Sequence, residues 1–392
     1  MAKSDYPLDG LKVLDFSRVL AGPFAGRMLC DLGADVVKIE PPDGDITRLW
    51  GHTVAGIPGY FHQQNAGKRN LCIDLRASGA VALVQELVAV ADIVIENYRP
   101  DVMGRLGIGY DALSAVNPRV IMLSISGFGH GGPESMRPAY APVVHAEAGL
   151  IDRVGSRFGV RKHDMPLSVA DTNASLHGLV GLLSAVIMRE RSGRGQHIDI
   201  AMIDATIATD DHMQYDLESS HANSVLPSEV WDTAIGPVLL STDARYLWKI
   251  LNRHCGVADP SNAQMTLAEK VAARREAMQQ FLLSLTTREQ FEETMQRLNL
   301  AWGMVRSAEG MREQPTVKAR GAIVDIDDRA GGVRPITQSP YRFSHAKSGV
   351  RGPASHRGEH NREVLQEWLA HSQASVAALL DAGVLQADAP AG

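Results

Sequence analysis

Short apolar runs alternate with amphipathic stretches over about the first 125 residues of the chain. Runs of consecutive apolar residues predict buried strands, and apolar positions spaced three to four residues apart predict helices. The expected strands are residues 12–16, 35–39, 71–75, 93–96 and 120–126, and the expected helices are residues 23–32 and 79–89. Strands that alternate with helices through short links are typical of a parallel sheet covered by helices. We therefore expect an α/β, Rossmann-like domain whose ligand lies at the carboxyl ends of the strands.

The strongest helical pattern covers residues 172–191 and is followed by Gly193 and Gly195, which stop it. Residues 197–203 come next as another strand or short buried run. The apolar positions of the long helix form one broad face, made of Leu176, Leu179, Val180, Leu183, Val186 and Ile187.

The character of the chain changes after about residue 205. Residues 209–227 are polar and irregular, as in a linker, and residues 264–298 predict two helices. The second helix opens with Thr286 and Thr287, followed by Glu289 and Gln290, which is a capping-box pattern. Residues 317–344 combine Gly, Pro and short β-like runs, and residues 363–380 predict a closing helical region.

Composition and charge narrow the class of protein. The 392 residues are 45% apolar and 21% charged, which excludes disordered and fibrous architectures. The net charge of −6 argues against nucleic acid as a partner but leaves a local basic pocket open. The three cysteines contain no CxxC spacing, so we expect neither a disulfide framework nor a structural zinc site. The chain shows no signal peptide and no membrane-length apolar stretch, so we expect a cytoplasmic protein.

Two local motifs carry little chemistry. Residues 127–132 (GFGHGG) match a GxGxxG dinucleotide fingerprint, but Pro133 and Pro138 follow and no clear helix opens, so a glycine loop is the better interpretation. The cluster of Asp210, Asp211 and His212 with His221 lacks ligand pairs at helical spacing, so a solvated loop is preferred to a metal site.

Asp171 lies in residues 168–173 (SVADTN), directly before the long helical pattern. One interpretation is an N-cap, in which its carboxylate accepts the free N–H groups of the first turn. The other interpretation is that Asp171 is a nucleophile. The helix N-terminus keeps its carboxylate ionised and presents it at a sheet edge, where it can attack an activated carbonyl carbon. The residues by themselves leave both interpretations open.

Several blocks occur in a fixed order over residues 8–205 and again near residue 360. They are LDGLKVLDF (8–16), AGP (21–23), GADVVKIEPP (33–42) with Gly44, Asp45 and Arg48, KRN (68–70), ENYRP (96–100), NPR (117–119), SGFG (126–129), RSGRGQ (191–196) and GEH (358–360). In order and spacing the blocks resemble the class III CoA-transferases, the CaiB/BaiF-like family of formyl-CoA transferase and carnitine CoA-transferase.

The resemblance implies an α/β fold with a Rossmann-like large domain, a smaller inserted α+β domain, and ring-like chains in an interlocked homodimer. On this basis residues 1–205 are the N-terminal part of the large CoA-binding domain and residues 206–225 a linker. Residues 226–325 are the small domain, and residues 326–392 form a C-terminal segment that returns to the large domain.

The resemblance also implies a role for Asp171, because the family's catalytic aspartate stands in the matching position. It implies a CoA-transferase that moves CoA from an acyl-CoA thioester to a carboxylic acid, without a metal. The aspartate forms a mixed anhydride with the donor acyl group and then an aspartyl-CoA thioester. An anhydride survives only where water is excluded, so we expect a glycine-bearing loop to close over the site. A small dicarboxylate, such as succinate or mesaconate, is the expected substrate.

Carried over position by position, the resemblance implies a CoA pocket with a substrate site beside it. Arg105 has the clearest physical reason, because a guanidinium binds the phosphates of CoA in a bidentate manner. For Val19, Ile73 and Leu106 ordinary core packing explains the residue equally well, and Tyr140 is either an active-site tyrosine or a packing aromatic. The expected residues are Val19, Ala21, Ile73, Asn97, Tyr98, Arg105 and Leu106 for CoA, and Tyr140 and Arg48 for the substrate.

Two alternatives stay open beside CoA transfer. The 2-methylacyl-CoA racemase branch of the family uses Asp and His to exchange a proton at the α-carbon, and its His stands where this chain has Tyr140, a weak base near neutral pH. The other alternative is a non-catalytic CoA-binding homologue, against which Asp171 speaks. Leu20 argues against formyl or oxalate specificity, and the missing run of glycines leaves the identity of the lid and the acyl specificity open. His145 and Glu147 either shape the acceptor pocket or are structural.

Overall fold

The computed structural model describes residues 5–220 and 228–388. The chain divides into two compact units. Residues up to Asp211, together with those from Ala319 onward, form one unit, called the large unit. His212–Lys318 forms the other, called the small unit. The C-terminal segment thus belongs to the same compact unit as the N-terminal half of the chain.

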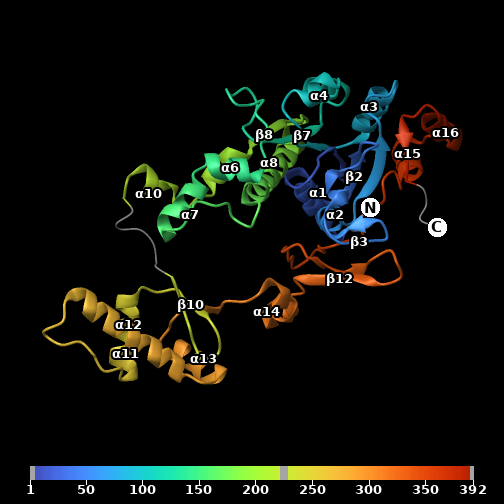
Figure 1. Ribbon diagram of the computed structural model, residues 1–392. Coiled ribbons are helices and arrows are strands. Elements are labelled where there is room, and N and C mark those ends of the chain that lie inside the picture. The colour runs from blue at the N-terminus through green and yellow to red at the C-terminus, as the bar shows by residue number, and fades with distance from the viewer. Residues whose placement is uncertain (1–4, 221–227, 389–392) are drawn as a thin grey trace. The chain divides into compact units, whose positions relative to one another are not determined.

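A seven-stranded sheet forms the centre of the large unit (Figure 1). Its strands lie in the order β14-β5-β2-β1-β6-β7-β8. All neighbours are parallel except β14, which pairs with β5 in the antiparallel sense. The predicted α/β class with a mainly parallel sheet is confirmed. The strands are β1 (Lys12–Asp15), β2 (Asp35–Glu40), β5 (Arg69–Ile73), β6 (Ile93–Glu96), β7 (Ile121–Ser126), β8 (His197–Ala201) and β14 (Leu385–Gln386).

Alternate residues of each strand enter two hydrophobic cores, one on each face of the sheet. In β1, Val13 packs in one core and Leu14 in the other, and both side chains are fully buried. Val13 pairs in register with Val36 of β2 and Ile93 of β6, which belong to the same core. Strands that are buried on both faces require apolar residues at consecutive positions, which explains the short apolar runs.

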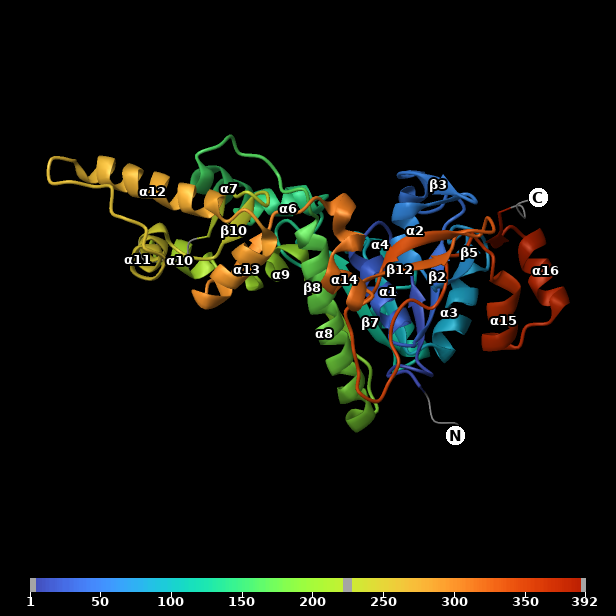
Figure 2. The same cartoon turned by 90° about the horizontal axis from the view of Figure 1, so that it is seen from below.

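Helices cover both faces of this sheet (Figure 2). Residues of α1, α6, α8 and α9 contribute to one core, and residues of α3, α15 and α16 contribute to the other. The helices of the large unit are α1 (Ala21–Asp31), α2 (Gly59–Asn65), α3 (Ala80–Val90), α4 (Val102–Arg105), α5 (Tyr110–Val116), α6 (Ala141–Glu147), α7 (Leu150–Phe158), α8 (Val169–Ser192), α9 (Met202–Ala208), α15 (Asn361–Leu369) and α16 (Gln373–Asp381), with a 3₁₀ turn at Ile46–Leu49.

The C-terminal segment is joined to β5 by hydrogen bonds as well as by strand pairing. The N–H of Gly358 donates to Oδ1 of Asn70 at 2.7 Å, and the N–H of Cys72 donates to Oδ1 of Asn361 at 3.0 Å. These contacts fix the GEH block beside the KRN block. Two hairpins complete the unit, β3 (Thr53–Val54) with β4 (Ile57–Pro58), and β12 (Ile323–Asp327) with β13 (Val333–Thr337).

Three local predictions need correction. The predicted strand at residues 197–203 is β8 only as far as Ala201, after which α9 begins at Met202. The expected linker contains a short helix, α10 (Met213–Leu217), and its residues 221–227 lie outside the described part of the chain. The long helix α8 begins at Val169 with Ser168 as its N-cap, so the interpretation of Asp171 as the N-cap is wrong.

The small unit is built around an antiparallel sheet in the order β11-β10-β9. Its core joins Trp231 and Leu247 to Leu282 and Phe291. The capping box predicted for the second helix is confirmed, with Thr287 as the N-cap of α13. The elements are β9 (Glu229–Trp231), β10 (Val238–Leu240), α11 (Ala244–Cys255), α12 (Leu267–Ser284), α13 (Arg288–Arg297), β11 (Trp302–Met304), a 3₁₀ turn at Ala308–Glu313 and α14 (Pro315–Ala319), which reaches the boundary of the unit. No helix in the described part of either unit is long and apolar enough to cross a membrane.

Candidate active site

A cavity of about 670 Å³ lies in the large unit, where the central strands end. Its wall includes Val19 after β1, Pro41 after β2, Asp74 after β5, Asn97 after β6 and Gly127 after β7. The carboxyl ends of parallel strands meet at one edge of a sheet, and loops that leave this edge commonly form ligand sites. The cavity therefore occupies the position that the strand pattern predicts.

Most of the residues expected for CoA and substrate line this one cavity. Two of them do not: Ile73 is fully buried in the core that contains α3, and Arg48 lies outside the cavity wall. The guanidinium of Arg48 instead binds the carboxylate of Glu40, with its Nε 2.5 Å from Oε1. The expected residues that line the cavity are Val19, Ala21, Asn97, Tyr98, Arg105, Leu106, Tyr140 and Asp171.

The turn between β1 and α1 is held in an unusual backbone conformation. Val19 has a φ of 66°, a left-handed conformation that is costly for a β-branched residue. Asn97 fixes the preceding residue through both ends of its amide: the N–H of Arg18 donates to Oδ1 at 2.7 Å, and Nδ2 donates to the carbonyl oxygen of Arg18 at 2.7 Å. On the other side, the N–H of Val19 donates to Oδ2 of Asp45 at 3.2 Å. The strained turn is thus clamped between two loops.

Buried charges beneath this turn support the clamp. Nζ of Lys38 donates to the carbonyl oxygen of Ser17 at 2.7 Å and to Oδ2 of Asp45 at 3.2 Å. Although burial opposes ionisation, the Lys38 ammonium and the N–H of Thr47 hold the pKa of Asp45 below its usual value. An ionised Asp45 keeps its full capacity as an acceptor, so it holds the N–H of Val19 in place. No local pattern in the sequence indicates this support, because Lys38 lies in β2 whereas Ser17 follows β1 and Asp45 follows β2.

Asp171 lies in the first turn of α8 and lines the cavity. Burial raises the pKa of its carboxyl to about 6, and the hydrogen bond from the backbone N–H of Ala21 acts in the opposite direction. The hydroxyl of Ser175 donates to the carbonyl oxygens of both Ala21 and Asp171, so the starts of α1 and α8 are tied together. A carboxylate that is partly desolvated yet still ionised at neutral pH is suited to nucleophilic attack.

Tyr60 is a second group near Asp171 that sequence analysis missed. Burial raises the pKa of Tyr60 to about 12, and the negative charge of Asp171 contributes to the increase. The phenol therefore stays protonated and can act as a hydrogen-bond donor. Its ring also packs against Trp50, with 5.3 Å between the ring centroids. Tyr60 is the second residue of α2, far from Asp171 in the sequence, and no local motif predicted its role.

Several arginines give the cavity positive charge, but they are not equally free. Nε of Arg105 lies 2.5 Å from a carboxylate oxygen of Asp101, one helical turn away. Arg18, by contrast, has no carboxylate partner among the described residues, and its guanidinium lies over the ring of Tyr98 at 5.4 Å from the centroid. Arg18 is thus an additional candidate for a phosphate group, which sequence analysis did not include.

The remaining candidates on α6 have different surroundings. Tyr140 is 67% exposed and precedes the first residue of the helix, so it is not a packing aromatic within this chain. Glu147 binds Arg137, with 2.6 Å between Oε1 and Nη2. His145 is fully buried, and its Nε2 accepts the N–H of Ala170, the residue before Asp171. His145 therefore contacts the backbone of α8.

The two motifs judged weak in the sequence have structural roles. Gly127 lines the cavity, and a Cβ at this position would lie 2.4 Å from the Cβ of Ala139, so the residue must be glycine. No helix opens directly after residues 127–132, since α6 begins only at Ala141. Asp210 binds Arg153, and His221 lies outside the described residues. In residues 5–220 and 228–388 no group of three His, Cys, Asp or Glu side chains is arranged to hold a metal ion.

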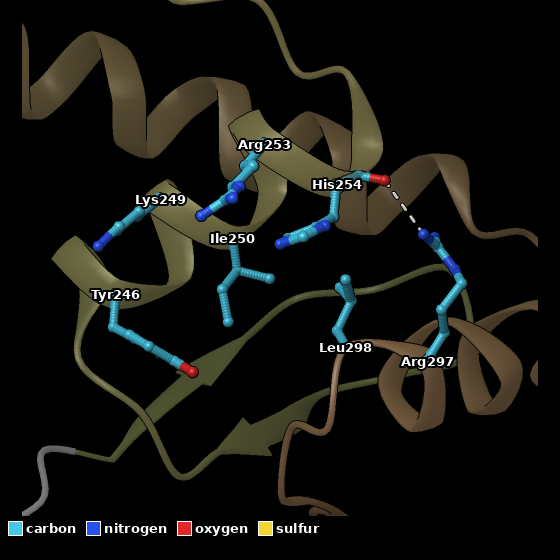
Figure 3. Close-up of a pocket in the computed structure, with 7 residues that line it drawn as sticks. All are labelled: Tyr246, Lys249, Ile250, Arg253, His254, Arg297 and Leu298. Carbon is cyan, nitrogen blue, oxygen red and sulfur yellow. Dashed lines mark hydrogen bonds between the residues drawn. The ribbon is translucent and has the colours of Figure 1, made fainter.

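A second cavity, of about 340 Å³, belongs to the small unit (Figure 3). Lys249, Arg253 and His254 reach it from α11, and Arg297 donates from Nη1 to the carbonyl oxygen of His254 at 3.1 Å. Its wall contains neither a carboxylate nor a thiol. The cavity of the large unit combines the desolvated carboxylate of Asp171 with several arginines, so it is the candidate active site.

The chain matches CoA-transferase family III over residues 8–361, and it belongs to this family. It is therefore a CoA-transferase. Succinate–glutarate CoA-transferase of Agrobacterium fabrum is 32% identical over 383 residues, which are 92% of this chain and 95% of that protein. Succinyl-CoA–D-citramalate CoA-transferase of Chloroflexus aurantiacus is 30% identical, with 95% and 96% covered. The crystal structure of a CaiB/BaiF family protein from Brucella suis is 32% identical, with a TM-score of 0.78 and 93% of this chain and all of that chain covered.

Proposed function

We propose that this enzyme moves CoA from an acyl-CoA thioester to a small dicarboxylic acid, with Asp171 as the nucleophile. One observation carries the proposal: Asp171 shares a cavity with arginines able to bind the phosphates of CoA. The cavity volume of about 670 Å³ is in the range of small-molecule sites.

The first half of the reaction releases the donor acid. A carboxylate oxygen of Asp171 attacks the thioester carbonyl, and the C–S bond breaks to give a mixed anhydride and the CoA thiolate. The thiolate then attacks the carbonyl carbon of Asp171 in the anhydride. The bond between this carbon and the bridging oxygen of the anhydride breaks, which leaves an aspartyl-CoA thioester and releases the donor acid as its carboxylate. Neither step consumes a water molecule or a proton.

The second half repeats these steps in reverse with the acceptor. The acceptor carboxylate attacks the aspartyl thioester, which forms a second anhydride and expels the CoA thiolate. The thiolate attacks the acceptor acyl carbon, and Asp171 leaves as a carboxylate. The N–H of Ala21 already donates to the Asp171 carboxyl. Such a preorganised donor stabilises oxygen atoms that gain charge, an effect worth about 3–4 kcal/mol per donor.

The substrate class rests on the names of the relatives. Proteins similar over nearly the whole chain are named for succinate and glutarate, and for succinyl-CoA and D-citramalate. We assign succinyl-CoA as the first donor to test and glutarate as the first acceptor. Arg18 and Arg105 bind the CoA phosphates in this proposal, and Tyr140 stands at the substrate end of the cavity.

The working enzyme in this proposal is an interlocked homodimer. The long helix α8 supports it, because Leu176, Val180 and Ile187 of the predicted apolar face are 46%, 66% and 56% exposed. Exposed apolar patches on a helix favour coverage by another surface, and a second copy of the chain is the cover that we propose. Sedimentation at micromolar concentration should give twice the chain mass of 42.4 kDa.

The direct test uses purified enzyme, succinyl-CoA and a panel of carboxylic acids, with new acyl-CoA products read by mass spectrometry. Asp171→Ala should abolish transfer while the protein stays folded and keeps its oligomeric state. Wild-type enzyme incubated with acyl-CoA alone should carry a CoA adduct on the Asp171 peptide. Transfer at the wild-type rate by Asp171→Ala would overturn the proposed mechanism. Rapid deuterium exchange at the α-carbon of a 2-methylacyl-CoA, without an acceptor, would indicate the racemase alternative.

A further inference from the structure

The helix that carries Asp171 has no local cap. The N-cap residue Ser168 makes no side-chain hydrogen bond to the first turn, although the first N–H groups of a helix have no acceptor within the helix. His145 supplies one of these acceptors from α6: its Nε2 lies 3.2 Å from the backbone nitrogen of Ala170. Both residues are fully buried, so water does not easily replace this bond.

The second ring nitrogen of His145 determines where the imidazole proton lies. Nδ1 is 2.7 Å from Oδ1 of Asp164, and the same oxygen accepts the N–H of Met165 at 2.8 Å. An ionised carboxylate only accepts hydrogen bonds, so Nδ1 carries the proton. Nε2 therefore keeps the lone pair that the N–H of Ala170 requires. Ala170 therefore donates a hydrogen bond to His145, and His145 donates one to Asp164.

We propose that His145, oriented by Asp164, is a positioning residue for Asp171. The inference rests on the proposed role of Asp171 as the nucleophile. Asp171 follows Ala170 directly, so the bond from Ala170 to His145 fixes the backbone beside the nucleophile. The N–H of Ala21 holds the carboxyl itself. Loss of the His145 bond leaves a buried N–H unpaired, and the first turn of α8 shifts to find another acceptor. A displacement of about 1 Å at a reacting group lowers the rate on the order of 100-fold.

Two variants of nearly equal size separate positioning from simple packing. The amide of His145→Gln reaches the place of Nε2 and accepts the N–H of Ala170. The amide of His145→Asn reaches only the place of Nδ1, so it keeps the bond to Asp164 and leaves Ala170 unpaired. We expect His145→Gln to retain kcat within a few-fold, and His145→Asn to lose about 10- to 100-fold in kcat with KM for acyl-CoA little changed.

The readout is the single-turnover rate at which the CoA adduct forms on the Asp171 peptide with succinyl-CoA alone, with melting temperatures as the folding control. If His145→Asn does not fold, Asp164→Leu takes its place, because the side chain of Asp164 is partly exposed. Asp164→Leu removes the carboxylate that holds the imidazole proton on Nδ1, so it should also slow adduct formation. Adduct formation at the wild-type rate in folded His145→Asn or Asp164→Leu, or equal losses in His145→Gln and His145→Asn, would overturn the inference alone. Full transfer by Asp171→Ala would instead overturn the proposed function, and the inference with it.

Discussion

Desolvation of Asp171 predicts that the enzyme loses activity on the acid side at a higher pH than an ordinary aspartate allows. With a pKa of about 6, the carboxyl is about nine-tenths ionised at pH 7 and about one-tenth ionised at pH 5. Only the ionised form attacks the thioester, so the rate of adduct formation should fall about tenfold across this range. An aspartate with the ordinary pKa of 3.8 would lose less than about a tenth of its rate.

The assay is single-turnover formation of the covalent CoA adduct between pH 5 and 8 at constant ionic strength. The acceptor acid is left out, so that its own ionisation does not enter the profile. The rate at low acyl-CoA concentration reports the ionisation of the free enzyme. Melting temperatures over the same range control for unfolding. A midpoint near pH 4 in a stably folded enzyme would refute the idea that Asp171 is desolvated before substrate binds.

The raised pKa of Asp171 also predicts how the stability of the protein depends on pH. Because the folded state raises the pKa of this acid, it favours the protonated form, and the contribution of Asp171 to stability is present below pH 3.8 and lost as the pH rises through about 6. Asp171→Asn should therefore increase the free energy of unfolding at pH 7 by about 1–3 kcal/mol, with little change near pH 4. Urea unfolding at the two pH values measures this difference, and equal effects at both would contradict it.

Three further predictions concern the surroundings of the site. In steady-state kinetics, Arg18→Gln should raise KM for acyl-CoA on the order of tenfold. Arg105→Gln should raise it less, because Arg105 already binds Asp101. Asn97→Ala should lower kcat by about tenfold or more by releasing the turn at Val19; an unchanged kcat would contradict the clamp. Nζ of Lys68 lies 2.8 Å from Oδ2 of Asp15, and both side chains are buried. Lys68→Met leaves the Asp15 carboxylate without this cation, so it should lower the free energy of unfolding by about 3–5 kcal/mol, as urea unfolding will measure.

Local sequence predicted the parts of the fold that depend on near neighbours. The apolar run at residues 12–16 becomes β1 because two cores bury its alternate residues, and Thr287 with Gln290 forms the predicted capping box. Local sequence did not predict the structure where one hydrophobic pattern fits both a strand and a helix. Residues 197–203 are apolar at enough positions for a strand or a helix, and the chain contains both, β8 and α9, in direct succession.

Some residues of the candidate site could also be identified from the sequence, and others could not. Asp171 was identifiable because it stands just before the predicted long helical pattern and matches the position of the family's catalytic aspartate, whereas Arg48 and Ile73 match family positions without lining the cavity. The sequence contained no sign that Glu40 would bind the guanidinium of Arg48, or that the charge of Asp171 would raise the pKa of Tyr60. Each pair joins two different elements of secondary structure, and only the folded chain brings those elements together.

The sequence by itself therefore determined the alternation of strands and helices, the mainly parallel sheet and the strand edge at which the cavity lies. These properties follow from periodicity and from the short links between elements, which are local. Tertiary structure alone decided the left-handed turn at Val19, which Asp45 and Asn97 clamp, and the bond from Ala170 to His145. Such hydrogen bonds connect residues from different elements of the chain and form only when the packing of strands, helices and loops places donor and acceptor within about 3 Å of one another.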